Sequence, residues 1–241
     1  MYFKFIDKII SFLENPYFFL TKLKKIDGGF IKDLIFIKSK LKYIPKTIID
    51  VGSSKGDFII ASLMVFPEVI VYAFEPIRES YDESLARTKN KKNVYIFNFA
   101  LGDENKVADF YLNYHAPSSS FKKMDAIHKT EYPFTSREKV IKTQIRRFDS
   151  INNIKLVRPI LVKIDVQGFE LEVIEGMGDK IKLIDCIEIE ISFKELYKGV
   201  PKVYEITKIL YKLGFKYFVQ RNPRFSKIDN KINFGDFIFF K

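Results

Sequence analysis

The alternation of strand-like and helix-like segments is the feature of this 241-residue sequence that most constrains its fold. Five apolar runs have the length and composition of strands: TIIDVG (47–52), VIVYAFE (69–75), VYIFNFA (94–100), ILVKID (160–165) and CIEIEI (186–191). Four segments carry apolar residues at helical spacing: 56–66, 77–88, 169–177 and 202–213. Such alternation is typical of a parallel sheet joined by right-handed crossovers.

The middle and the end of the chain depart from this alternation. VADFYL (107–112) and VIKTQIRRF (140–148) are predicted strands, and the segment between them, 113–139, is predicted to be a long polar loop. A loop of this length inside a compact domain is usually functional or mobile. FKYFVQ (215–220) and DFIFFK (236–241) predict a closing hairpin. The pattern therefore predicts an α/β sheet of about seven strands, with the last pair antiparallel.

The chain is predicted to divide into an N-terminal helical extension, 1–46, and an α/β domain, 47–241. The extension is the most basic part of the sequence and begins with an aromatic, amphipathic stretch. Its first helix would place these apolar residues on one face: Phe3, Phe5, Ile6, Ile9, Ile10 and Leu13. That face could dock on its own domain, lie on a membrane surface or serve a homodimer.

Charge and cysteine content bound the class of protein. The net charge of +11 is spread along the chain, so it raises the prospect of contact with a polyanion, an anionic membrane or an acidic substrate. A solvated lysine-rich surface is the simpler explanation. No apolar run approaches the ~18–20 residues that span a bilayer. The single cysteine, Cys186, cannot form an internal disulfide and lies in a strand pattern. These features predict a cytoplasmic protein.

A glycine turn after the first predicted strand points to a nucleotide-like ligand. In IIDVGSSKGDF (48–58), Gly52 and Gly56 are spaced G-x-x-x-G, which is neither the dinucleotide fingerprint nor a phosphate loop. Asp50 is placed to receive an amino group, and Glu75, at the end of the second strand, could accept both hydroxyls of a ribose. Together these residues favour S-adenosylmethionine, whereas the glycines alone would fit a generic tight turn.

The chain resembles the FkbM-type S-adenosylmethionine-dependent methyltransferases over roughly residues 47–241. The motifs that carry the resemblance are IIDVGSSKGDF, AFEPIRESYDESL, NFALGDENKVADFYL, SSSF, RRFDSI, ILVKIDVQGFELEVIEGM, IEIEI and GDFIFF. The resemblance implies a class I methyltransferase fold, Rossmann-like, with a mostly parallel seven-stranded sheet, the last strand antiparallel and helices on both faces. It also implies methylation of hydroxyl groups, often on surface polysaccharide sugars or natural products.

The family pattern implies a set of cofactor-binding residues: Asp50, Gly52, Ser53, Ser54, Gly56, Glu75, Pro76, Ala100, Leu101, Gly102, Asp103 and Asp165. The residues from Asp50 to Gly56 would line the methionine side of S-adenosylmethionine, and those from Ala100 to Asp103 would border the adenine. Two positions depart from the pattern. Ser53-Ser54 stands where the family often has alanine-asparagine, and Gln167 replaces a frequent glutamate, which removes it as a candidate base.

Asp165 is the leading candidate for the base that accepts the proton of an alcohol, because strand carboxyl ends line the crevice of an α/β sheet. It could instead cap the following helix or fix Lys163. Glu170 could act beside it or complement the helix dipole. Glu190 is the better candidate on the fifth strand, while Glu188 is expected to be paired or solvated.

Two histidines and a metal-assisted variant complete the catalytic alternatives. His115 and His128 both lie in the segment 113–139, and His115 could swing over the cofactor as a base, although loop histidines are more often exposed. Asp165 and Glu190 could also act as oxygen ligands for Mg²⁺, but no cluster of acids requires a metal, and none is predicted.

Three functions compete for this sequence. An O-methyltransferase acting on a small molecule or saccharide is the leading hypothesis, with acceptor specificity in 113–139 and the N-terminal helices. The charge suggests a nucleic-acid methyltransferase as an alternative, but Asp-Val-Gln-Gly-Phe (165–169) lacks the proline-plus-aromatic motif that usually holds a flipped base, so no nucleic acid is expected as partner. The third is an inactive module that retains only the cofactor pocket.

Overall fold

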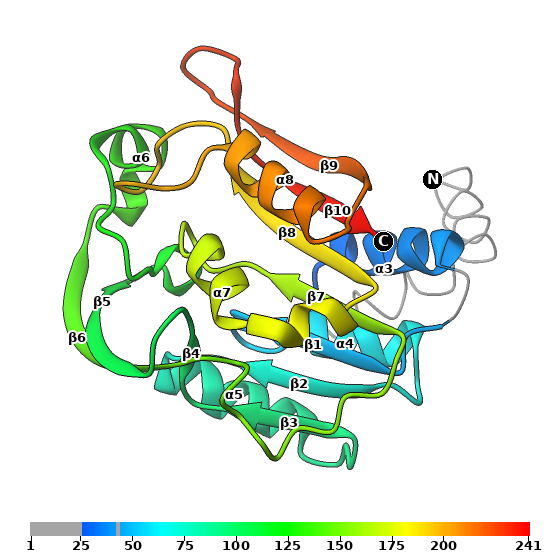
Figure 1. Cartoon of the computed structure of the whole chain (residues 1–241). Coiled ribbons are helices and arrows are strands. Elements are labelled where there is room, and N and C mark those ends of the chain that lie inside the picture. The colour runs from blue at the N-terminus through cyan, green and yellow to red at the C-terminus, as the bar shows by residue number, and fades with distance from the viewer. Residues whose placement is uncertain (1–25, 42–43) are drawn as a thin grey trace, which may run out of the picture.

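The computed structural model describes residues 26–41 and 44–241 (Figure 1). The predicted amphipathic face at residues 3–13, with its membrane and dimer alternatives, lies outside the described residues. Within the described part of the chain, no helix is long and apolar enough to cross a membrane.

The centre of the molecule is a seven-stranded sheet. Its strands are β1 (Thr47–Val51), β2 (Ile70–Phe74), β3 (Val94–Phe97), β7 (Ile160–Ile164), β8 (Cys186–Ser192), β9 (Tyr217–Phe225) and β10 (Ile232–Phe240). They lie in the order β3-β2-β1-β7-β8-β10-β9, and β10 runs antiparallel to both of its neighbours. The predicted mostly parallel sheet with an antiparallel last strand is therefore confirmed.

The middle strands are buried on both faces, as their apolar sequences require. Every residue of β1 and of β7 is buried, which is usual for parallel strands covered by helices on both sides. The closing hairpin is longer than predicted, because the residues after Gln220 also pair with β10. Pro223 argues against a strand when only the sequence is considered, but β9 is an edge strand, and edge strands tolerate a proline.

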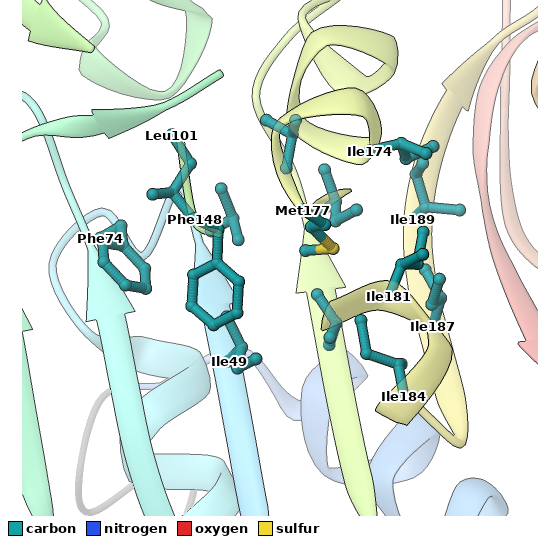
Figure 2. Close-up of a cluster of buried hydrophobic side chains, with 14 of the residues drawn as sticks. Ile49, Phe74, Leu101, Phe148, Ile174, Met177, Ile181, Ile184, Ile187 and Ile189 are labelled. Atoms are coloured by element: carbon teal, nitrogen blue, oxygen red, sulfur yellow. The ribbon is translucent and has the colours of Figure 1, made fainter. Parts of the chain in front are cut away.

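Helices cover both faces of the sheet (Figure 1). On one face, α3 (Gly28–Lys40) and α4 (Asp57–Val65) share an apolar core with the strands, while α5 (Arg78–Thr88) packs beside β3. On the other face lie α7 (Glu170–Gly176), the short helix η3 (Gly178–Leu183) and α8 (Val203–Lys212). Figure 2 shows this second core, where Met177 and Ile181 lie over the sheet residues Ile187 and Ile189.

Helix α3 belongs to the predicted extension but packs on the domain. Ile31, Leu34 and Ile37 are buried against α4. Asp27 begins the helix by accepting a hydrogen bond from the backbone of Gly29. Its buried Asp33 pairs with Arg221 of β9. The described part of 1–46 is thus continuous with the core of the α/β domain.

The middle of the chain forms a second, three-stranded sheet that was not predicted. Its strands are β4 (Ala100–Leu101), β5 (Lys106–Asn113) and β6 (Glu138–Arg146), in the order β4-β6-β5. The predicted strand 94–100 is wrong in extent, because it breaks after Phe97. There the side chain of Asn98 turns to the carbonyls of Glu75 and Pro76, and the chain then joins the second sheet.

The predicted loop 113–139 contains short helices. These are η1 (Ala116–Ser118), α6 (Ala126–Glu131) and η2 (Pro133–Thr135). Asp125 begins α6 by accepting a hydrogen bond from Ile127, and a bridge between Met124 and Tyr197 ties the segment to the chain after β8. These contacts hold the segment over the carboxyl ends of the strands.

The packing of Gly176 in α7 against Gly102 provides a test of the fold. A Cβ at Gly176 would lie 1.8 Å from the carbonyl oxygen of Gly102. We expect Gly176→Ala to lower the free energy of unfolding by about 1–3 kcal/mol, because the backbone at residue 102 would have to move. Gly28→Ala is the matched control, since its Cβ would meet nothing within 4 Å. Equal stability of the two variants in urea unfolding would contradict this packing.

Candidate functional site

A cavity of about 340 Å³ opens at the carboxyl ends of β1, β2, β7 and β8. One side comprises strand ends and the turns that follow them, and includes Gly52, Ser54, Glu75, Asp165 and Glu190. The other side comes from β5 and the segment after it, with contributions from the chain after β8 and from β10: Phe110, His115, Ala116, Pro117, Ser118, Ser119, Phe121, His128, Tyr132, Phe134, Thr135, Leu196 and Phe234. Clefts at strand carboxyl ends are the usual ligand sites of α/β sheets.

The turn after β1 requires glycine at both predicted positions. Gly52 has φ +83°, and a Cβ there would lie 2.0 Å from the carbonyl oxygen of Asp165. Gly56 has φ +82°, and its Cβ would lie 2.5 Å from Oγ of Ser84. Glycine therefore permits the left-handed backbone and brings the end of β1 against the end of β7.

Glu75 holds this turn through its carboxylate. Oε2 accepts a hydrogen bond from the backbone N–H of Ser54 at 2.7 Å, and Oε1 accepts one from Ile77 at 2.8 Å. Burial raises the pKa of Glu75 to about 7, although these two hydrogen bonds favour the charged form. Each carboxylate oxygen has a second lone pair, so Glu75 can still accept hydroxyl donors from a ligand in the cavity.

Lys163 is a buried cation directly beneath the site. Its Nζ lies 2.9 Å from Oδ2 of Asp165 and over the rings of Phe30 and Phe58, at 5.4 and 5.5 Å from their centroids. Burial alone would lower the pKa of Lys163, but the neighbouring carboxylates, that of Asp165 above all, raise it. Burial would likewise raise the pKa of Asp165, and the charge and hydrogen bond of Lys163 lower it instead. Asp165 therefore faces the cavity as a carboxylate.

Other carboxylates near Lys163 lack this direct contact. Asp50 is fully buried, and neither of its oxygens has a hydrogen-bond partner among the described residues, so burial raises its pKa to about 7. Glu188 is also buried, with its pKa raised well above the usual value by burial, which contradicts the expectation of a paired or solvated side chain. Among residues 26–41 and 44–241, Lys163 is the cation that acts on both of these carboxyl groups.

Gln167 joins the two acids at the cavity floor. Its Nε2 donates to Oδ1 of Asp165 at 3.0 Å and to Oε1 of Glu190 at 2.9 Å. The hydroxyl of Tyr197 donates to Oε1 of Gln167 at 3.0 Å. Burial raises the pKa of Glu190 well above its usual value, and the nearby Asp165 charge adds to this effect.

The histidines lie on the opposite side of the cavity. His115 is exposed, its Nδ1 lies 3.1 Å from Oγ of Ser118, and its ring packs edge-on against Phe134. His128 is buried against Tyr132 and Tyr197, and burial lowers its pKa to about 4. His128 is therefore neutral at physiological pH.

The predicted site residues divide into two groups. Those that line the cavity are Gly52, Ser54, Glu75, Pro76, Ala100, Leu101, His115, Asp165 and Glu190. Those that do not line it are Asp50, Ser53, Gly56, Gly102, Asp103 and Glu170. Glu170 accepts a hydrogen bond from the backbone of Gly168 at 2.9 Å, and burial raises its pKa to about 7.

The two structural alternatives for Asp165 have different outcomes. Asp165 does not cap α7, whose first turn follows Phe169 without a side-chain cap, but it does fix Lys163. No group of three or more His, Cys, Asp or Glu side chains among residues 26–41 and 44–241 is arranged to hold a metal ion.

Sequence reasoning missed Gln167, Tyr197 and the aromatic lining. Gln167 was set aside because it is not an acid, yet its amide contacts both acids. Tyr197 stands in no recognisable motif, so its hydroxyl could be found only from the fold. Because the segment 113–139 is mostly polar, sequence reasoning did not select Phe121, Tyr132 and Phe134, which line the cavity.

The cavity differs from the chain as a whole in its ionisable groups. The described residues that line it include three acids, Glu75, Asp165 and Glu190, and neither a lysine nor an arginine. The lysines of the described residues therefore lie outside this lining. This cavity suits a cationic or neutral ligand better than an anionic one.

The sheet order, the glycine turn after β1 and the acid after β2 define the class I methyltransferase architecture. The family model described as the methyltransferase FkbM domain matches residues 50–217. The chain therefore belongs to the FkbM methyltransferase family, which confirms the family and fold class predicted from its motifs. Its domain is an S-adenosylmethionine-dependent methyltransferase domain.

Two curated relatives support the methyltransferase class. A tRNA (guanine-N(7)-)-methyltransferase of Aquifex aeolicus is 29% identical over 183 residues, which are 70% of this chain and 56% of the relative. The 2-O-methyltransferase NoeI of Sinorhizobium fredii is 26% identical over 181 residues, which are 72% of this chain and 74% of the relative. The chain thus spans little more than half the length of the first.

Solved structures share the fold. Methyltransferase FkbM from Methylobacillus flagellatus matches with a TM-score of 0.56 at 15% identity, covering 90% of this chain and 49% of that one. The N-terminal domain of EvdMO1, solved in the presence of SAH and D-fucose, matches with a TM-score of 0.51 at 9% identity, covering 89% and 83%. At these identities the likeness shows the fold alone.

The buried carboxylate of Asp50 predicts a pH dependence of stability. Because its folded-state pKa of about 7 lies above the ordinary 3.8, the folded state retains the proton between these values, and stability falls as pH rises through this window. Asparagine does not titrate, so Asp50→Asn should lack this loss. The unfolding free energy of the variant minus that of wild type should therefore rise by about 2–4 kcal/mol between pH 4 and pH 8. Urea unfolding without ligand measures the difference.

The exposed Asp179 provides the control for this measurement. Asp179→Asn changes the same chemical group at a site that is 91% exposed, so its difference from wild type should not follow pH in the same way. If the difference in unfolding free energy between Asp50→Asn and wild type did not change with pH, this would contradict the burial of an unpartnered carboxyl group at residue 50.

Proposed function

We propose that this chain is an S-adenosylmethionine-dependent O-methyltransferase that acts on a neutral hydroxyl group of a saccharide or other small molecule. The observation that carries this proposal is the composition of the cavity, which combines three acids with aromatic walls and has no basic side chain among its described lining residues. We further propose that it works in the cytoplasm, as the cysteine content suggests.

S-adenosylmethionine is proposed to bind at the strand-end side of the cavity. Gly52 and Ser54 would lie beside the methionine part, Glu75 would accept the ribose hydroxyls, and Ala100 and Leu101 would border the adenine. Asp50, which does not line the cavity, would act through its charge on Lys163 and Asp165. When bound, the cofactor supplies a methyl group on a positively charged sulfur, and an acidic cavity favours that charge.

The remaining side of the cavity is proposed as the acceptor site. Phe121, Tyr132, Phe134 and Phe234 present apolar faces that suit the C–H faces of a sugar ring or another apolar ring. Asp165 is proposed as the base, because Lys163 keeps it ionised and its position faces the cavity. It would hold the acceptor hydroxyl and take up its proton. Glu190 and His115 remain the alternative acceptors of this proton.

The relatives favour different acceptors, so we compare each class of acceptor with the residues that line the cavity. The tRNA methyltransferase relative supports a nucleic-acid acceptor. The name of the 2-O-methyltransferase NoeI supports transfer to an oxygen, and the D-fucose named with EvdMO1 supports a sugar. RNA would bring phosphates toward Glu75, Asp165 and Glu190 with no basic side chain in the lining to bind them. We therefore propose a saccharide or small-molecule acceptor rather than RNA.

The proposal is tested by comparing acceptors that differ only in charge. Each sugar of a panel and its phosphate ester are assayed separately as acceptors, and tRNA transcripts are assayed in the same way. The measured quantity is transfer of a labelled methyl group. We expect at least tenfold higher kcat/KM for the neutral member of each pair that reacts, because the phosphate would enter an acidic cavity. SAH binding is measured in parallel by calorimetry.

Two outcomes would contradict the proposal. Salt-sensitive binding and methylation of tRNA would establish the nucleic-acid alternative instead. Failure of the folded protein to bind SAH would favour the inactive module.

The proposed base is tested by Asp165→Asn. The amide retains the shape of the side chain but cannot take up a proton, so methyl transfer should fall at least a hundredfold while SAH affinity changes little. Asp50 and Glu188 remain near Lys163, so the variant should fold, which its thermal unfolding transition checks. Turnover close to wild type would place the base elsewhere, with His115 next to be tested.

A further inference from the structure

We propose that Gln167 is a positioning residue that couples the segment covering the acceptor site to the carboxylates of Asp165 and Glu190, with Tyr197 fixing its orientation. This inference rests on the proposed methyl transfer. It assigns a role to a side chain that is neither acid nor base.

The amide nitrogen of Gln167 is fully used by the two acids. Nε2 has two hydrogens, and it lies 3.0 Å from Oδ1 of Asp165 and 2.9 Å from Oε1 of Glu190. The acids come from the ends of different strands, β7 and β8, so the amide bridges them across the cavity floor. Because each hydrogen is directed at one carboxylate, Gln167 fixes the position of both.

The amide oxygen of Gln167 is fixed from the opposite side. The Tyr197 hydroxyl lies 3.0 Å from Oε1 of Gln167 and 3.1 Å from the carbonyl oxygen of Ser118. Burial raises the pKa of Tyr197, so the hydroxyl keeps its proton and acts as a donor. An amide flipped by 180° would turn its oxygen toward the Asp165 carboxylate, which has no proton to donate, so the observed orientation is favoured.

The backbone of Gln167 is bound to the same covering segment. Its φ is +55°, a left-handed conformation that a glutamine rarely adopts, and its carbonyl accepts a hydrogen bond from Oγ of Ser120 at 2.7 Å. Ser120 in turn pairs with Tyr111 of β5. The chain around Ser118–Ser120, which lines the acceptor side, therefore contacts Gln167 through both backbone and side chain.

The surroundings explain why an amide suits this position. The charged groups that act on Asp165 come from every neighbouring strand and from α7: Lys163, Asp50, Glu75, Glu170, Glu190 and Asp236. Within the part of the chain that the structure describes, one lysine thus faces Asp165 and these five further carboxyl groups. A further acid at residue 167 would remove both N–H donors and add negative charge beside the base, which would raise its pKa.

Gln167→Glu is the central experiment, with the pH dependence of methyl transfer as its readout. We expect the acid limb of the kcat/KM profile to move to higher pH by about one unit or more, because the base would be harder to ionise. SAH affinity should stay within about threefold of wild type. Gln144→Glu, on the exposed face of β6, is the matched control and should leave the profile unchanged.

Tyr197→Phe tests the other end of the amide with less disturbance of packing. The ring keeps its contact with His128 but loses the hydroxyl, so the Gln167 amide is free to turn. We expect kcat to fall about three- to tenfold with KM for SAM little changed. Wild-type kcat and pH profile in both folded variants would overturn the proposal.

A second readout separates this inference from the proposed function. Without cofactor, the unfolding free energy of Gln167→Glu relative to wild type should fall as pH rises from about 4 to 7, because the new acid would have a raised pKa beside Asp165 and Glu190. A flat difference would overturn the contact of Gln167 with both acids. If this slope appears but wild type neither binds SAH nor transfers methyl, the proposed function fails and the bridge stands.

Discussion

The buried pair of Lys163 and Asp165 is the interaction on which the site depends. A lysine at the centre of a parallel sheet is unfavourable unless it is compensated, and here a carboxylate at 2.9 Å and two aromatic rings provide that compensation. In return, Lys163 keeps Asp165 ionised among carboxyl groups whose pKa values are raised. Because Phe30 of α3 forms part of this enclosure, the N-terminal region helps determine the electrostatics of the cavity.

The separation of charge in this protein limits what its net charge can mean. A sequence with an excess of eleven positive charges suggests polyanion binding, yet the described lining of the cavity contains three acids and no basic side chain. The surface charge can affect solubility or bring the protein to an anionic neighbour. The proposed chemistry at the strand ends, transfer from a sulfonium to a neutral hydroxyl, needs no basic side chain in the lining.

The sequence predicted what depends on local pattern and left open what depends on tertiary contacts. The strands, the glycine turn and the placement of Glu75 and Asp165 followed from apolar runs and from the punctuation at their ends. The break after Phe97 did not, because it depends on Asn98 reaching carbonyls 22 and 23 residues away. Tyr197 contacts Gln167 from 30 residues further along the chain, so no spacing rule could have joined them.

The two sides of the cavity differ in how many substitutions they can tolerate. The cofactor side is constrained by backbone, since a Cβ at Gly52 would meet Asp165 at 2.0 Å and almost any change there must move a strand. The acceptor side is formed by side chains on short helices, which can change without disturbing the sheet. Where Ser120 and Tyr197 attach that segment to Gln167, however, a change in acceptor lining also moves the acids that would act on the acceptor. In the proposed function, acceptor choice and the orientation of the base would therefore be physically linked.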